Sequence, residues 1–203
     1  PLVDPTCGSG TFCIEAAMIG MNMAPGLHRH FAFEEWNWVD SDLVGCVRAR
    51  ALGQIKQDIQ LDILGTDIDA RMVEIAKRNA EEAGVSEQIL FKQMRLQDLH
   101  TDKINGVIVS NPPYICERER AEMEAHVLDY EPASALFVPD SDPLLFYRAL
   151  ARLGQQLKAA AVLVEINQAY GQETVEMFQS SGYSNVELHR DIYGKDRMIK
   201  AVR

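Results

Sequence analysis

A polar and aromatic motif, Asn111-Pro112-Pro113-Tyr114, follows the apolar run 106–109, which reads as a buried strand. Asn111 supplies a side-chain oxygen, and two consecutive rings fix the direction of the Pro112 carbonyl. Two hydrogen-bond acceptors, each bound to one N–H group of a planar amine, favour a pyramidal nitrogen, whose lone pair can attack an electrophilic carbon. Tyr114 offers an aromatic face on which a flat group can stack. We therefore predict that Asn111, Pro112 and Tyr114 form a catalytic site that works mainly by positioning. A rigid strand-ending turn is the structural alternative.

A glycine-containing turn lies near the start of the chain, in the segment Asp4-Pro5-Thr6-Cys7-Gly8-Ser9-Gly10-Thr11. Its two glycines let the backbone approach a ligand, and the helix predicted to follow points its amides at that ligand. Cys13 stands where the third glycine of G-x-G-x-x-G belongs, and no G-K-[ST] is present, which disfavours dinucleotide and P-loop sites. A ligand without phosphate but with a cationic amino group, such as S-adenosylmethionine, fits better, with Asp4 binding the ammonium directly or through water. A tight structural turn explains this motif alone equally well.

Acidic residues also follow the next two predicted strands. Asp67 is suited to accept hydrogen bonds from both hydroxyls of a ribose, and Asp69 is suited to cap the next helix. The alternative is that both aspartates cap that helix. Asp98 can accept from the exocyclic amine of adenine. The predicted cofactor-binding residues are Asp4, Cys7, Gly8, Ser9, Gly10, Thr11, Asp67, Ile68, Asp98, Leu99 and Asn111.

Strands alternate with helices along the sequence, which is typical of a parallel, doubly wound sheet. We expect strands near 2–3, 61–65, 89–94, 104–110, 160–166, 185–188 and 198–202, and helices near 11–23, 42–57, 69–84, 116–126, 142–157 and 170–181. No helix separates the last two strands, so they can pair as an antiparallel hairpin. The predicted fold is α/β: a three-layer, Rossmann-like class I methyltransferase sheet, mostly parallel, with seven strands. Residues 1–203 form one domain, with an aromatic insertion at 27–58.

The charge, the cysteine spacing and the length of the apolar runs limit the kinds of partner and location expected for this domain. The 203 residues carry 30 acidic and 20 basic side chains, a net charge of -10, which disfavours binding of a phosphate backbone by this domain alone. The four cysteines have no C-x2-C spacing, so we expect reduced thiols in a cytoplasmic protein and no metal. No run approaches the ~20 apolar residues of a membrane span, and no signal peptide is expected. The abrupt start within a strand indicates that a preceding segment is missing.

The ordered set of motifs resembles the class I S-adenosylmethionine-dependent amino-methyltransferases, in two different branches. Residues 1 to about 110 resemble the catalytic domain of THUMP-linked RNA guanine-N2 methyltransferases. This resemblance lies in Asp4 to Phe12, Ile14 to Ala17, Ala24 to Leu27 and Phe31 to Trp36. It implies methylation of the exocyclic amine of guanine in ribosomal or transfer RNA.

Residues from about 110 to 203 resemble instead the HemK/PrmC release-factor glutamine methyltransferases. The matching stretches are Asn111 to Ile115, Val127 to Pro132, Ala135 to Phe137, Asp142 to Tyr147 and Gly194 to Arg197. This resemblance implies methylation of the side-chain amide of the glutamine in a Gly-Gly-Gln loop.

Each half departs from the pattern of the other branch, and the chain has the N-terminal substrate-recognition domain of neither. The insertion around Trp36 is foreign to the release-factor enzymes, and the Tyr130-Glu131-Pro132 stretch is foreign to the RNA enzymes. A chimera joined near the fourth strand and a divergent natural enzyme both explain this. We expect a peptide chain release factor as the substrate. RNA is the alternative substrate, and an inactive chimeric scaffold is the alternative from another class.

Overall fold

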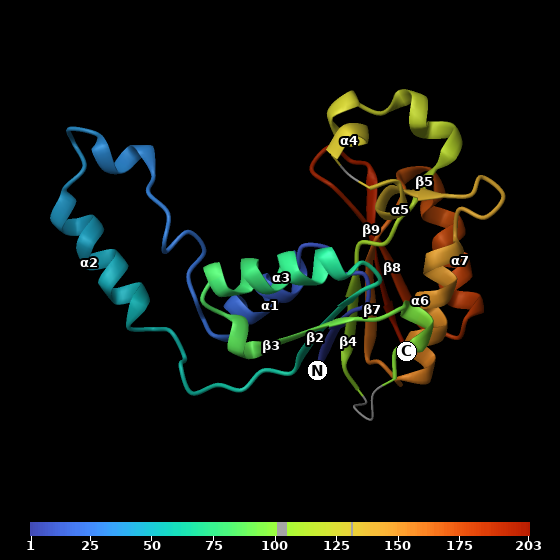
Figure 1. The fold of residues 1–203 in the computed structure, drawn as a ribbon, viewed down its shortest axis with the longest axis horizontal. Helices are drawn as coiled ribbons and strands as arrows, with labels where there is room; N and C mark the ends of the chain where they lie inside the picture. Colours follow the sequence, from blue (N-terminus) through green and yellow to red (C-terminus); the bar gives the residue numbers. More distant parts are fainter. Residues whose placement is uncertain (101–104, 131) are drawn as a thin grey trace.

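The computed structural model describes residues 1–100, 105–130 and 132–203 and confirms the predicted α/β fold (Figure 1). Its seven-stranded sheet has the order β3-β2-β1-β4-β7-β9-β8. The first five of these strands are parallel, and β9 pairs antiparallel with both β7 and β8. The strands are β1 (Leu2–Asp4), β2 (Ile63–Asp67), β3 (Ile89–Gln93), β4 (Val107–Ser110), β7 (Ala161–Glu165), β8 (Asn185–Arg190) and β9 (Asp196–Val202).

Helices pack on both faces of the sheet and form two buried clusters. On one face, α1 (Thr11–Gly20) and α3 (Ala70–Glu82) cover β2 and β3, and the cluster includes Ile63 and Phe91. On the other face, α6 (Leu145–Gln156) and α7 (Gly171–Ser180) cover β4, β7 and β9. In α3 and α6 the apolar residues recur at helical spacing, and these are the residues that the sheet buries.

Several element boundaries differ from those that the sequence predicts. Helix α1 ends at Gly20 rather than 23, and β2 starts at Ile63 because the Leu61 amide bonds to the Gln88 side chain at 3.0 Å instead of to a strand. The helix expected over 142–157 begins later, at Leu145, and its predicted start at Asp142 is wrong because the Asp142 carboxylate pairs with Arg148 instead of capping the helix. The start predicted for the fourth strand, residue 104, lies outside the described residues.

The segment between β4 and α6 holds structure that the sequence did not predict. Two short parallel strands, β5 (Ile115–Cys116) and β6 (Phe137–Val138), form a second sheet. The helix expected over 116–126 is a 3₁₀ helix, η4 (Glu117–Glu122), followed by α4 (Ala125–Tyr130), and α5 (Ala133–Leu136) leads into β6. The shorter 3₁₀ helices η2 (Ser86–Gln88), η3 (Leu96–Asp98) and η5 (Gln168–Tyr170) lie in the other connections.

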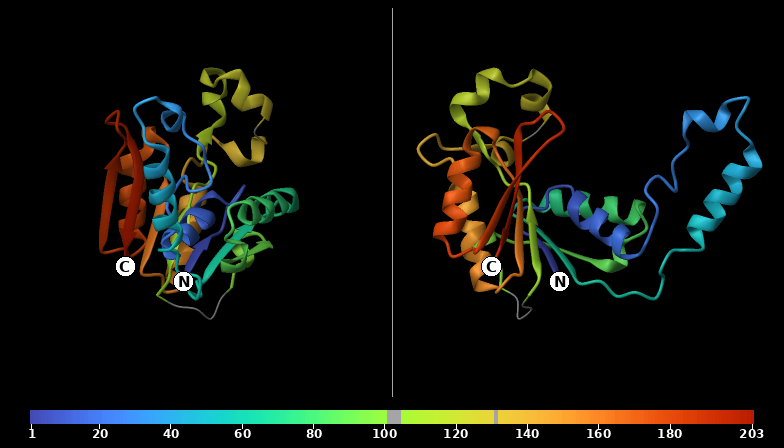
Figure 2. Two further views of the ribbon diagram at one scale, coloured as in Figure 1. Left: turned by 90° about the vertical axis from the view of Figure 1, so that its left-hand side faces the viewer. Right: turned by 180° about the vertical axis from the view of Figure 1, so that it is seen from behind.

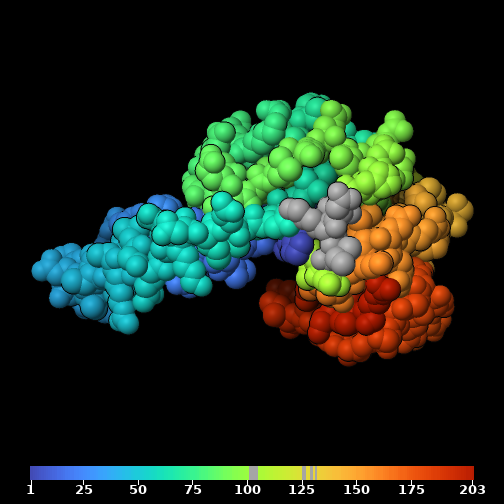
Figure 3. Space-filling model, turned by 90° about the horizontal axis from the view of Figure 1, so that it is seen from below, coloured from blue at the N-terminus to red at the C-terminus, as the bar shows by residue number. Residues whose placement is uncertain are grey.

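Residues 27–58, the predicted insertion, form an arm that extends away from the sheet and its helices (Figures 2 and 3). It contains η1 (Ala32–Glu35) and α2 (Ser41–Leu52). Its aromatic rings contact one another, with 5.1 Å between the ring centroids of Trp36 and Trp38. Arg48 fastens α2 to the preceding loop through the Leu27 carbonyl at 2.6 Å. The Trp38 side chain nevertheless remains 78% exposed. None of the helices that the described residues form has the length and apolarity needed to cross a bilayer.

Candidate active site

The parallel pairing of β1 with β2 and β4 brings three predicted motifs to one edge of the sheet. Leu2 of β1 lies opposite Ile63 of β2 and Val107 of β4, so the three strands run in the same direction and end within two residues of one another. A hydrogen bond of 2.6 Å between the hydroxyls of Thr6 and Ser110 joins the loop that follows β1 to the last residue of β4. The glycine turn, Asp67 and the Asn111 motif are therefore neighbours at the carboxyl end of the sheet, where ligands bind in such folds.

The glycine turn is held open by backbone hydrogen bonds. The Cys7 amide donates to the Thr66 carbonyl at 2.9 Å, and the Gly10 amide donates to the Cys7 carbonyl at 2.8 Å. Gly8 has a φ of 52°, and a Cβ placed there would meet no atom within 4 Å, so the turn faces open space. Gly10 has a φ of 88°, and its Cβ would lie 3.0 Å from the Ala76 Cβ. One glycine thus leaves room on the ligand side, and the other lets the turn pack on α3.

Asp4 is a buried acid beneath this turn. It is the last residue of β1, and only 1% of its surface is exposed. Burial raises the pKa of its carboxyl to about 7, with a further contribution from the charge of Asp67, although the hydrogen bond from the Thr6 amide at 3.2 Å opposes the rise. A cationic group brought close to Asp4 would favour the ionised form and lower this pKa.

Asp67 connects the glycine turn to the start of α3. Its carboxylate accepts from the Gly8 amide at 3.0 Å and from the Asp69 amide at 2.9 Å. Asp69 is the helix cap, because its carboxylate accepts from the Arg71 amide at 2.8 Å. The Asp67 oxygens therefore already bind two backbone amides at the open side of the turn, and each oxygen has a second lone pair.

The remaining predicted cofactor residues differ in exposure. Ile68 is 62% exposed beside Asp67, and the Asp98 side chain is exposed at the end of η3. The Leu99 side chain is 1% exposed and packs in the core with α6, so only its backbone is available to a ligand. The Cys7 side chain is buried as well, whereas Ser9 and Thr11 lie close together, with 3.4 Å between their hydroxyls.

The acceptor motif, Asn111-Pro112-Pro113-Tyr114, which is predicted to hold a planar amine, directly follows β4. The Asn111 residue is exposed, and both prolines are buried. The Tyr114 ring packs against the core cluster, and its hydroxyl donates to Glu165 Oε1 at 2.8 Å. Burial raises the pKa of this phenol to about 12, and the Glu165 carboxylate adds to the rise. The phenol is therefore a hydrogen-bond donor throughout the physiological pH range.

Sequence reasoning missed the polar residues that hold this motif in place. Asn167 donates to the Tyr114 carbonyl at 3.2 Å and to Glu119 at 2.9 Å, and Glu119 accepts from the Cys116 amide at 2.7 Å. Glu165 is the second missed residue. Its position as a polar residue that ends an apolar strand is the same signal that identified Asp4 and could have found it.

The thiols near the site are not reactive groups. Burial, followed by the charge of Asp4, raises the pKa of both Cys7 and Cys13 well above the usual range. A nucleophilic thiol needs a lowered pKa, so covalent catalysis by these cysteines is disfavoured.

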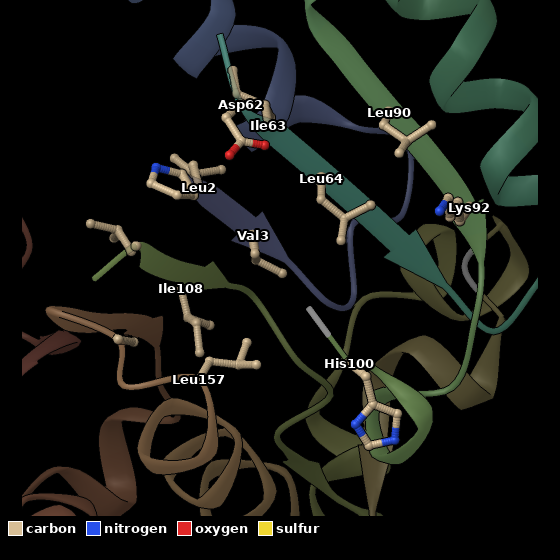
Figure 4. A pocket seen from close by; sticks show the side chains of 14 residues that line it. Leu2, Val3, Asp62, Ile63, Leu64, Leu90, Lys92, His100, Ile108 and Leu157 are labelled. Carbon is tan, nitrogen blue, oxygen red and sulfur yellow. The ribbon is translucent and has the colours of Figure 1, made fainter. Parts of the chain in front are cut away.

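A surface hollow lies elsewhere, along the middle and amino-terminal parts of the strands (Figure 4). Apolar strand residues such as Leu64, Leu90 and Ile108 line it, together with Lys92 and His100. None of the residues predicted to bind cofactor or acceptor lines this hollow, so it is not the candidate site.

Comparison with known proteins identifies the relatives of this chain. A family model described as UPF0020, RMKL-like, methyltransferase domain, matches residues 1–128. YpsC of Bacillus subtilis, assigned as an RNA methyltransferase, is 53% identical over 114 residues, or 56% of this chain. The release factor glutamine methyltransferase of Bacteroides thetaiotaomicron is 44% identical over 166 residues, or 78% of this chain. The matches span only 30% and 57% of the lengths of these two relatives.

A solved structure resembles the whole chain. It is a methyltransferase crystallised with SAH, at 42% identity and a TM-score of 0.73. The match covers 100% of this chain but 47% of that one. The relatives therefore confirm the mixed resemblance seen in the sequence, to RNA enzymes and to release-factor enzymes.

Proposed function

The chain is an S-adenosylmethionine-dependent methyltransferase domain of the UPF0020, RMKL-like family, and on this premise we propose which group it methylates. The acceptor is a planar amine, most specifically the side-chain amide of a glutamine in a peptide chain release factor. The observation that supports this choice is the match of 166 residues to a release factor glutamine methyltransferase. The family model ends at residue 128, so this longer match must include residues beyond that point.

The cofactor pocket is the glycine turn and its acidic neighbours. The open space beside Gly8, the buried Asp4 carboxyl and the half-buried Asp67 carboxylate fit a ligand with an ammonium group and ribose hydroxyls. We assign the ammonium to Asp4, the ribose to Asp67 and the adenine to Ile68 and Asp98. When bound, S-adenosylmethionine supplies an electrophilic methyl group on a sulfonium centre.

The acceptor motif provides the groups that hold a planar amine. We propose that the Asn111 side-chain oxygen accepts one N–H bond and the Pro112 carbonyl accepts the other, which directs the nitrogen lone pair at the methyl carbon. The N–C bond forms as the S–C bond breaks, and the methylated nitrogen, now acidic, releases its proton to water. No strong base is required, so most of the catalysis is positioning.

Charge supports a protein substrate over RNA. The net charge of -10 gives this domain little electrostatic affinity for a phosphate backbone. A glutamine side chain presented on a protein loop needs no such surface. The polar loop between β4 and α6, which includes α4, lies beyond the carboxyl end of the sheet (Figure 1) and provides a wall for such a loop.

Methyl transfer from labelled S-adenosylmethionine tests the substrate directly. We expect label in a release factor with a Gly-Gly-Gln loop, and none when that glutamine is replaced by alanine. Ribosomal RNA is the parallel substrate. Label in RNA alone would refute the glutamine assignment.

Guanine in RNA is the second candidate. The 53% identity to the RNA methyltransferase YpsC over 114 residues supports it, and so does the family match over residues 1–128. If calorimetry detects cofactor binding but neither substrate is labelled, the chain is an inactive scaffold, and both assignments fail.

A further inference from the structure

The carboxyl end of β7 holds Tyr114 at two points. Glu165, the last residue of β7, accepts from the Tyr114 hydroxyl at 2.8 Å. Two residues later, the Asn167 side chain donates to the Tyr114 carbonyl at 3.2 Å. The two bonds fix both the ring and the backbone of the residue that closes the acceptor motif. Because Pro112 and Pro113 are rigid, a constraint on Tyr114 is transmitted to Asn111.

Glu165 is itself contacted by Arg197 of β9, which lies next to the turn between β8 and β9. The Arg197 guanidinium lies 3.8 Å from Glu165 Oε1, and its other nitrogen donates to Asp191 at 3.3 Å. Asp191 accepts from the amides of Tyr193 and Lys195, at 2.9 and 3.0 Å, which shapes the turn. This turn reaches the end of the sheet that carries β5 and α4 (Figure 2, red). A continuous chain therefore runs from Asp191 through Arg197 and Glu165 to Tyr114.

The contact between Tyr114 and Glu165 has the properties of a strong constraint. A hydroxyl that donates to a carboxylate forms a charge-assisted bond, which is stronger than a bond between neutral groups. The Glu165 side chain is 28% exposed, and the Arg197 side chain is 34% exposed, so water competes only partly for this contact. The bond also uses the Tyr114 hydroxyl, which leaves the ring to pack on the core.

We propose that Glu165 is a positioning residue of the methyl-transfer site: through Tyr114, it fixes the acceptors on Asn111 and Pro112 relative to the methyl group. The inference rests on the proposed function and adds the residue that sets the geometry of the acceptor motif. Glu165 itself does not touch the substrate. Its effect is expected in kcat, because a small displacement of a positioned acceptor costs rate more than it costs binding.

Two substitutions and a matched control test this role. Glu165→Ala removes the acceptor for the Tyr114 hydroxyl, and Glu165→Gln keeps an oxygen acceptor of nearly the same shape. Glu187→Ala is the control, because Glu187 accepts from Lys200 across the β8–β9 hairpin and makes no contact with the motif among the contacts of the described residues. We expect Glu165→Ala to lower kcat by roughly 10- to 100-fold, with the cofactor Kd within about threefold. Glu165→Gln should recover most of the rate, and Glu187→Ala should leave it unchanged.

A double-mutant cycle separates positioning through Tyr114 from a general loss of structure. If Glu165 acts through the phenol, Glu165→Ala should slow the reaction little further in a Tyr114→Phe background. If the two substitutions lower the rate by factors that multiply in the double variant, the proposal is overturned. A Glu165→Ala variant with the wild-type kcat would overturn it too.

Hydrogen exchange provides a measurement that does not depend on turnover. We expect faster exchange in the segment 114–122 of Glu165→Ala than in wild type, with no change in the glycine turn or in Glu187→Ala. If wild type labels neither substrate, the proposed function fails, and the exchange result still decides whether Glu165 orders the motif. Equal exchange in Glu165→Ala and wild type would overturn the inference.

Discussion

Replacing Asp4 with asparagine should make the cofactor-free protein more stable and its cofactor binding weaker. Asp4 is 1% exposed, and burial raises the pKa of its carboxyl from 3.8 to about 7. Asparagine has nearly the same shape and can still accept from the Thr6 amide, which the Asp4 carboxylate accepts at 3.2 Å. The substitution therefore removes the cost of a buried charge and leaves the local hydrogen bond in place.

The size and pH dependence of the stability change follow from the pKa of Asp4. In the unfolded chain the carboxyl loses its proton near pH 4, and in the folded chain it keeps the proton up to a pH of about 7. Between these values the unfolded state binds fewer protons, so wild-type stability falls as the pH rises, by about 1.4 kcal/mol per pH unit. Over about three units, the full difference is on the order of 4 kcal/mol. Asp4→Asn has no such loss.

Cofactor binding should change in the opposite direction. The ammonium group of S-adenosylmethionine offsets the charge of Asp4 in wild type but finds only a neutral amide in the variant. A hydrogen bond to a charged group contributes about 1.5–3 kcal/mol, so affinity at pH 8 should fall by roughly 10- to 100-fold. A stabilising substitution that weakens binding is the pattern expected of a functional buried charge.

The measurement is urea unfolding of the cofactor-free proteins from pH 5 to pH 8, combined with calorimetry of cofactor binding. Asp58→Asn, at an exposed aspartate of the arm, is the control and should change neither quantity. The stability difference between Asp4→Asn and wild type should grow by about 2 kcal/mol between pH 5 and pH 7. A stability difference that stays constant with pH would refute the raised pKa of Asp4. Unchanged affinity would refute the assignment of the ammonium to Asp4.

Three further substitutions test the site and the turn. Asn111→Ala should abolish methyl transfer while leaving the cofactor Kd, measured by calorimetry, within about tenfold, and retained transfer would discredit the acceptor role. Asp67→Ala should weaken cofactor binding by ~1–3 kcal/mol in the same titration, and an unchanged Kd would remove the ribose from this residue. Gly10→Ala should lower the free energy of unfolding, measured in urea, by at least ~1 kcal/mol more than Gly84→Ala does, because overpacking adds to the strain. Both glycines have positive φ, at 88° and 72°, but only the Gly10 Cβ would crowd Ala76, so equal losses would contradict the packing argument.

Local patterns were sufficient to predict the order of the main strands and helices and to propose a place for the site. The spacing of Val73, Ala76 and Ala80 marked the buried face of α3, and Asp69 marked its cap. These signals are local, because helix periodicity and capping depend on residues within one or two turns. The meeting of Asp4, Asp67 and Asn111 at one edge then follows from a parallel sheet alone, since the carboxyl ends of its strands lie on the same side.

Patterns of only two residues gave either no signal for secondary structure or a misleading one. Strands β5 and β6 each have two residues, and they pair across more than twenty positions of sequence. Asp142 followed by Pro143 has the composition of a helix start, yet the helix begins at Leu145 and the aspartate binds Arg148. In both cases a long-range contact or an ion pair outweighed a weak local preference.

The fold class that the structure shows could be predicted from the sequence, and the cofactor turn and the acceptor motif could be proposed from it, because each depends on a periodicity or on the residues that end a strand. The tertiary structure alone decided that Asp4 is buried deeply enough to hold its proton to a pH of about 7, and that Tyr114 bonds to Glu165, 51 positions away. It also decided that the arm extends from the body. Burial and side-chain partners depend on which distant segments pack together, and no local pattern in a sequence encodes that packing.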